Sequence, residues 1–228
     1  MSDNAHDHLL LPCRDPQEEP LHHAAGGTAR ATPIALVTHA ATAEGSALAQ
    51  LLLLGGCEVF LQADTGAEVA SLRAAFPAAA RPLRADLDSD AGIERVVTHV
   101  ARTAGRLDIL VNVQPTHRPV PGLDDWPAWI GENVLRPLRV LGAAEALIGD
   151  GAALLVPRAG CGNPPDAVAE TALQALAELM RAPAHLLPRV NVLVADGRLS
   201  CPELALLGRN LLAARHLGGE LVWPGRLA

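Results

Sequence analysis

Residues 33–61 read PIALVTHAATAEGSALAQLLLLGGCEVFL, and the order of apolar runs in this stretch decides the fold class. The run Ile34–Val37 is continuously apolar, as expected of a strand that is buried on both faces. A turn of small residues leads into Ser46–Leu54, which has helical apolar spacing, and Gly55-Gly56 supplies a C-cap. Glu58–Leu61 is the next strand, so the stretch predicts one βαβ unit.

The same alternation continues along the chain. Further helices are predicted at Gly66–Ala75, Ala91–Thr103, Trp126–Ile148, Pro165–Arg181 and Pro202–His216, and further strands at Pro82–Ala85, Asp108–Val113, Ala152–Val156, Val190–Ala195 and Glu220–Trp223. Strands that alternate with helices of this length indicate a parallel sheet with helices on both faces. We predict an α/β, Rossmann-like doubly wound sheet of six or seven strands in one domain, residues 33–228, preceded by a flexible N-terminal tail, residues 1–32.

Composition and charge exclude several functions. Half of the 228 residues are apolar, enough for a large core, and the net charge of −7 argues against nucleic-acid binding or an anionic membrane surface. No apolar run approaches the roughly 18 residues that span a bilayer, and the first residues do not resemble a secretory signal. The four cysteines lack the spacing of a metal site or a disulfide framework, so we expect no metal and a reduced, cytoplasmic protein.

Two residue types are missing from the chain. It contains no tyrosine and no lysine, because all 18 basic residues are arginine. A Schiff-base lysine, a phosphate-loop lysine and a tyrosine acid or base are therefore excluded.

Four segments carry a family resemblance. They are Ala35–Thr38 with Gly45 and the strand start Gly56–Val59, the stretch from Asp86 to Asn112, Glu132–Val134 and Arg189–Val192. Together they resemble the short-chain dehydrogenase/reductase family over about residues 33–228. The resemblance implies a Rossmann-like fold, an NAD(H) or NADP(H) cofactor, and oxidoreductase chemistry by an Asn–Ser–Tyr–Lys tetrad.

The phosphate-binding turn departs from the family pattern. The family has T-G-x-x-x-G-x-G, whereas residues 38–45 read THAATAEG. His39 adds a bulky side chain that would fill the phosphate site, and Ala43 adds a methyl group on the path of the pyrophosphate. Glu44 lies in the first helical turn, where its carboxylate would repel a phosphate. Only Gly45 remains, which the resemblance assigns to helix–strand packing.

Some cofactor positions of the family are retained. The resemblance implies weak remnants of a binding site at Thr38, Gly45, Asp86, Leu87 and Asn112. Asp86 corresponds to the residue that meets the adenine, and Asn112 mainly braces the strands. Asp64 could bind a ribose, although the resemblance places Ala63 at the family's ribose-binding position. The glycine near the nicotinamide ribose is lost, so we expect no tightly bound cofactor and at most weak NAD(H) or NADP(H) binding.

The catalytic tetrad is reduced to Asn133. Pro137, four residues later, leaves the Asn133 carbonyl without its usual helical partner. The serine, tyrosine and lysine positions of the family are occupied by Pro157 or Arg158, by Asp166 and by Glu170. Two acids cannot reproduce a tyrosine whose pKa is lowered by a lysine. We therefore predict no catalytic residues of the family type.

Several candidates also have a structural interpretation. Asn112 and Asn133 can brace buried backbone instead of marking a live site. Asp166 and Glu170, one helical turn apart, allow acid–base chemistry or form a solvated helix face. His117 either lies at the mouth of a pocket or belongs to a surface loop.

Two helices are candidates for a partner interface. In the family, the helices that correspond to Trp126–Ile148 and Pro165–Arg181 pack against the same helices of a neighbouring subunit. Their apolar residues are Trp126, Trp129, Ile130, Leu138, Leu141, Val168, Ala172, Leu176, Leu179 and Met180. Apolar residues on more than one side of a helix are typical of a helix between a sheet and a partner, although they can also serve only to cover the sheet.

The leading hypothesis is a pseudoenzyme. It is a non-catalytic subunit that assembles, as a hetero- or homo-oligomer, with an active NAD(P)-dependent short-chain dehydrogenase, for example one of the hydroxyacyl-CoA type, and stabilises or regulates it. Two alternatives stay open: an oxidoreductase of the same family with altered chemistry that uses neither tyrosine nor lysine, and a dinucleotide-sensing interaction module.

Overall fold

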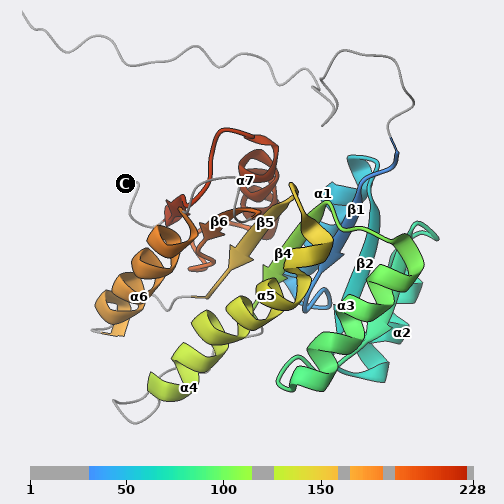
Figure 1. Cartoon of the computed structure of the whole chain (residues 1–228), viewed down its shortest axis with the longest axis horizontal. Helices are drawn as coiled ribbons and strands as arrows, with labels where there is room; N and C mark the ends of the chain where they lie inside the picture. The colour runs from blue at the N-terminus through green and yellow to red at the C-terminus, as the bar shows by residue number, and fades with distance from the viewer. Residues whose placement is uncertain (1–30, 115–125, 159–164, 182–187, 225–228) are drawn as a thin grey trace, which may run out of the picture.

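The computed structural model describes residues 31–114, 126–158, 165–181 and 188–224 (Figure 1). The side chains of Trp126, Trp129 and residues 165–170 lie outside this description. The predicted tail, residues 1–32, lies outside it as well, apart from residues 31 and 32.

The centre of the fold is one seven-stranded sheet in which every pairing is parallel. From edge to edge the strands are β3 (Ala80–Arg84), β2 (Glu58–Ala63), β1 (Ile34–Val37), β4 (Ile109–Val113), β5 (Ala152–Val156), β6 (Arg189–Leu193) and β7 (Leu221–Val222). The strand order reverses at β1 and β4, as in a doubly wound Rossmann-like sheet. The predicted fold class is therefore confirmed, with seven strands.

Helices cover both faces of the sheet (Figure 1). One face carries α1 (Ala43–Leu54), α2 (Gly66–Ala75) and α7 (Cys201–Ala213), and the other carries α3 (Asp90–Ala104), α5 (Arg136–Ile148) and α6 (Pro165–Met180). Successive strand residues alternate between two apolar cores, so that Leu36 packs under one helix layer and Val37 under the other. This double burial explains why the strands have continuous apolar sequences.

Side-chain caps set where the helices begin. α1 begins at Ala43 because the Thr42 hydroxyl accepts a hydrogen bond from the Gly45 N–H at 3.1 Å. The predicted start at Ser46 is therefore wrong by three residues. α2 begins with a reciprocal capping box, in which backbone N–H donation from Thr65 lowers the pKa of Glu68.

The other predicted ends differ from the observed ones by at most three residues, the largest difference being at the end of α7, which stops at Ala213 rather than His216.

The helix predicted over Trp126–Ile148 has the predicted ends but is not α-helical throughout. The structure has three helical pieces in direct succession: α4 (Trp126–Ile130), the π-helical segment η2 (Gly131–Leu135), and α5. Pro137 has no N–H and cannot donate to the carbonyl one turn before it. The Arg136 N–H donates to the Gly131 carbonyl, five residues earlier, so the helix passes the proline by widening one turn.

The topology places a switch point between β1 and β4, and the region at the carboxyl ends of these strands is here called the crevice. β1 continues into α1 on one face of the sheet, whereas β4 leads to the helices on the opposite face. The carboxyl ends of these neighbouring strands therefore mark the switch point at which open α/β sheets bind ligands.

Candidate functional site: the crevice at β1 and β4

Thr38 joins the carboxyl ends of the two central strands. Its hydroxyl accepts a hydrogen bond from the Val113 N–H at 3.0 Å and lies 3.2 Å from both Asn112 Oδ1 and the Val113 carbonyl, one of which takes its proton. All of these groups are buried. At this position Thr38 therefore stabilises the fold directly.

His39 is buried in the turn after β1, with a backbone φ of 44°. Its Nδ1 lies 2.7 Å from the Val113 carbonyl, which assigns the ring proton to Nδ1. Its Nε2 lies 3.6 Å from an Asp64 carboxylate oxygen. Burial lowers the pKa of His39, and the nearby Asp64 opposes this shift.

Gln62 completes the surroundings of His39. Its Oε1 accepts the His39 backbone N–H at 2.7 Å, while its Nε2 donates to Asp64 Oδ1 at 2.9 Å and to the Ala85 carbonyl at 2.7 Å. Asp64, the acid considered for a ribose, is thus engaged by Gln62, and Ala63 beside it is buried. Sequence reasoning missed Gln62. The signal that could have found it is a polar amide side chain within an otherwise apolar strand.

An ion pair crosses the crevice. Glu44, in the first turn of α1, accepts a hydrogen bond from the Arg158 guanidinium at 2.7 Å, and the two side chains are 13% and 24% exposed. The Arg158 backbone N–H donates to Asn133 Oδ1 at 3.1 Å. Sequence reasoning placed these three residues at separate family positions and did not connect them.

Gly45 packs against its own turn. A Cβ atom at this position would lie 2.6 Å from the His39 carbonyl oxygen and 3.0 Å from Thr42 Oγ1. The close contact that requires glycine is therefore made within the turn, rather than with a strand as the resemblance implied.

The rim beyond β3 is formed by a short acidic turn. Asp86 is exposed, and its carboxylate accepts the Asp88 N–H at 2.9 Å, whereas Leu87 is buried in the apolar core. The largely buried Arg136 of α5 pairs with Asp88. Sequence reasoning singled out neither partner of this ion pair.

Two buried amides lie at the end of β4. Gln114 Nε2 donates to Asn112 Oδ1 at 3.0 Å. Within the described residues, Asn112 Nδ2 and Gln114 Oε1 have no hydrogen-bond partner. Both atoms are sealed from solvent, so they provide no open ligand site.

The resemblance implies a dinucleotide, but the residues of the crevice do not fit its pyrophosphate. A phosphate at the N-terminus of α1 would meet the Glu44 carboxylate, and the Gly45 N–H is already bonded to Thr42. The Arg158 guanidinium, which could neutralise a phosphate, is bonded to Glu44. The charges that a dinucleotide would need are therefore satisfied within the protein.

The remaining predicted site residues are not brought together by the described structure. Pro157 is buried beside Arg158. Asp166 and Glu170 lie on α6, but their side chains are outside the description, as is the whole of His117.

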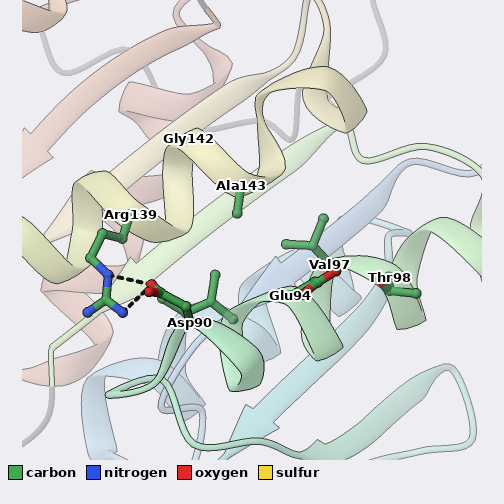
Figure 2. Close-up of a pocket in the computed structure, with 8 residues that line it drawn as sticks. Asp90, Glu94, Val97, Thr98, Arg139, Gly142 and Ala143 are labelled. Atoms are coloured by element: carbon green, nitrogen blue, oxygen red, sulfur yellow. Dashed lines mark hydrogen bonds and ion pairs between the residues drawn. The ribbon is translucent and has the colours of Figure 1, made fainter.

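A pocket lies apart from the crevice, between α3 and α5 (Figure 2). Its volume is about 520 Å³, and it is lined by Asp90, Ile93, Glu94, Val97, Thr98, Arg139, Gly142 and Ala143. An ion pair between Asp90 and Arg139 spans its rim. None of the crevice residues contributes to this pocket.

The described residues include neither a cluster of metal-ligating side chains nor a helix that could span a membrane. They contain no group of three or more His, Cys, Asp and Glu side chains that could hold a metal ion. None of their helices combines the length and apolarity needed to cross a membrane.

The residues predicted for an interface fall into four groups: buried, partly buried, exposed, and outside the description. Leu141, Leu176 and Met180 are buried in the core beneath their own helices. Ile130, Leu138 and Ala172 are partly buried against the same core, whereas Leu179 is 62% exposed. The side chains of Trp126, Trp129 and Val168 lie outside the description. Covering the sheet is therefore the role of the first group.

Comparison with known proteins supports the family resemblance. The family described as short chain dehydrogenase matches residues 33–123, from just before β1 to beyond β4. A protein named as ketoacyl reductase 2 of the granaticin polyketide synthase, from Streptomyces violaceoruber, is 32% identical over 110 residues. That alignment covers 45% of this chain and 44% of the relative, so less than half of either protein is compared. Together with the parallel seven-stranded sheet, these matches show that the chain is similar to short-chain dehydrogenases over the part that contains β1 to β4.

Proposed function

We propose that the chain is a non-catalytic subunit with a short-chain dehydrogenase fold, which assembles with an active NAD(P)-dependent member of the same family. The observation that carries the proposal is the absence of tyrosine and lysine from the entire sequence. The family's proton transfer needs a tyrosine whose pKa is lowered by a nearby cation, and no residue of this chain can provide that pair.

The retained asparagine supports the same proposal. Asn133 is buried, and its side-chain oxygen holds the backbone of Arg158. Arg158 occupies one of the two positions considered for the family's serine, and its guanidinium is directed to Glu44. In this arrangement the remnant of the tetrad stabilises the fold and offers no hydroxyl to a carbonyl substrate.

The similar relative suggests the chemistry of the complex. It is named as a ketoacyl reductase, so we expect the active partner to reduce a ketoacyl thioester or to oxidise the corresponding hydroxyacyl compound. The outer surface of the helices over residues 126–148 and 165–181, where Leu179 is exposed, is the surface proposed to receive that partner.

Native mass spectrometry of the tagged full chain, isolated gently from its host, tests the proposal. We expect a stoichiometric complex with a second protein that has an intact glycine-rich turn, serine and Tyr-x-x-x-Lys motif. The isolated chain should not oxidise NADH or NADPH in the presence of an acetoacetyl thioester, and addition of the partner should restore turnover. Turnover by the isolated chain, or a stable partner without those motifs, would contradict the proposal.

A further inference from the structure

The ion pair across the crevice has a role of its own. We propose that the Glu44–Arg158 ion pair excludes dinucleotides from the crevice and that Glu44 is the residue that determines this exclusion. The inference does not depend on the proposed function, because a chain without catalytic residues can still bind a dinucleotide.

The position of the ion pair follows from the strand order. Glu44 extends from α1, directly after β1, whereas Arg158 follows β5. β4 lies between these two strands in the sheet. The contact between the two side chains therefore spans the carboxyl end of β4, which is the place where a doubly wound sheet binds its ligand.

Both ends of the ion pair are held by the fold. Glu44 is fixed within the first turn of a helix that Thr42 caps. The Arg158 N–H donates to Asn133 Oδ1, and Arg158 also forms a parallel β-bridge with Ala195. These contacts make Asn133 a positioning residue for Arg158, so the guanidinium reaches Glu44 from a constrained backbone.

The charges explain why the contact excludes an anion. Glu44 and Arg158 are largely shielded from water, so their attraction is stronger than that of an exposed pair. A pyrophosphate could bind Arg158 only by displacing the Glu44 carboxylate, which would remain close to it with the same sign of charge. Removal of the carboxylate would leave a poorly solvated guanidinium beside a helix N-terminus, and both features favour an anion.

Binding of ADP-ribose to the isolated full chain tests this inference. ADP-ribose carries the pyrophosphate and both riboses of the cofactor but cannot be reduced, so the readout is binding and not activity. The variants are Glu44→Ala, Glu44→Gln and the double variant Glu44→Ala with Arg158→Ala. Asp90→Ala is the matched control, because it releases Arg139 from an ion pair on the outer surface.

We expect wild type and Asp90→Ala to show no saturable binding in isothermal titration calorimetry up to about 1 mM. Glu44→Ala and Glu44→Gln should bind at least about tenfold more tightly than wild type, with affinity that falls as salt is added. The double variant should lose this gain.

Three outcomes would overturn the inference: wild-type binding as tight as that of Glu44→Gln, no gain in a folded Glu44→Gln variant, or an equal gain in Asp90→Ala. Glu44→Gln keeps the side-chain size, so it decides the result if Glu44→Ala does not fold. The binding experiment uses the isolated chain, so its outcome does not depend on whether a partner subunit exists. A negative result here would therefore not contradict the proposed assembly, which native mass spectrometry tests.

Discussion

At the scale of single residues, His39 shows how the turn after β1 is stabilised without the glycine that the family pattern has at this position. A φ of 44° costs an L-residue about 1 kcal/mol or somewhat more, and glycine avoids that cost. His39 offsets it with two buried hydrogen bonds, one from its backbone N–H to Gln62 and one between its ring and the Val113 carbonyl. The turn therefore keeps a glycine-like backbone, and His39 ties it to β2 through its backbone N–H and to β4 through its ring.

The lowered pKa of His39 predicts a pH-dependent stability. Its unfolded-state pKa is near the ordinary value of 6.5, and burial lowers it in the fold, so the unfolded chain binds the proton more readily. The free energy of unfolding should therefore decrease as the pH falls through 6.5, until folded His39 is protonated too. Urea unfolding of wild type and His39→Asn at pH 7.5 and pH 5.5 measures this effect.

His39→Asn is the suitable comparison because asparagine tolerates a left-handed backbone and does not titrate in this range. Between pH 7.5 and pH 5.5, the free energy of unfolding should decrease more in wild type than in the variant. An equal loss in both proteins would show that His39 does not titrate as its burial requires.

At the scale of secondary structure elements, the close approaches of helices decide where glycine is needed. Gly92 lies in the first turn of α3, and a Cβ atom there would overlap the Asp86 carbonyl. Gly142 lies within α5 and faces open space. The two glycines therefore have opposite roles: the first permits contact, whereas the second only weakens its helix.

Alanine substitutions of these two glycines should change stability in opposite directions. Gly92→Ala should lower the free energy of unfolding by about 2 kcal/mol or more, because the turn that leads into α3 must shift. Gly142→Ala should raise it by about 0.5–1 kcal/mol, since alanine favours a helix over glycine. Chemical denaturation measures both values. An unchanged free energy of unfolding in Gly92→Ala would contradict the prediction, because it would show that the turn at Asp86 shifts at little cost.

At the scale of the whole molecule, the two faces of the sheet provide a test of the proposed assembly. Leu179 on α6 is 62% exposed, and Leu54 at the end of α1 is 84% exposed on the opposite face. If the partner binds the α5–α6 side, Leu179→Glu should lower the fraction of complex in native mass spectrometry at least about tenfold. Leu54→Glu should leave it unchanged, and both variants should unfold at about the wild-type temperature. Equal loss of complex in both would contradict the assigned surface.

The fold could be predicted from the sequence because its signals are local. A strand buried on both faces, such as Ile34–Val37, is apolar throughout, and the bounds of α2 and β5 follow directly from such patterns. The absence of tyrosine and lysine is likewise visible without a structure.

The contacts of the candidate site could not be predicted in the same way. Glu44 and Arg158 are 114 positions apart, and only the parallel arrangement of β1, β4 and β5 brings them together. The partners of His39 come from two other strands, and the π-helical turn before Pro137 depends on a choice of hydrogen bonds that the proline alone does not specify. Each of these contacts depends on how segments that are distant in the sequence pack together, and sequence periodicity does not encode that packing.

The central position of β1 has a consequence for synthesis of the chain. β1 pairs on one edge with β2, which follows it closely in the sequence. Its other edge pairs with β4, which is synthesised much later, and the Ile34 N–H donates to the Asp108 carboxylate, 74 positions later. A ribosome that pauses before β4 therefore holds a nascent chain in which the central strand β1 has an open, apolar edge. Once β4 emerges, the adjacent strands β3, β2, β1 and β4 are all available to pair while β5 to β7 are still untranslated, and the family match spans this part of the chain. A pause in translation before β4, which begins at Ile109, therefore prolongs the exposure of this strand edge.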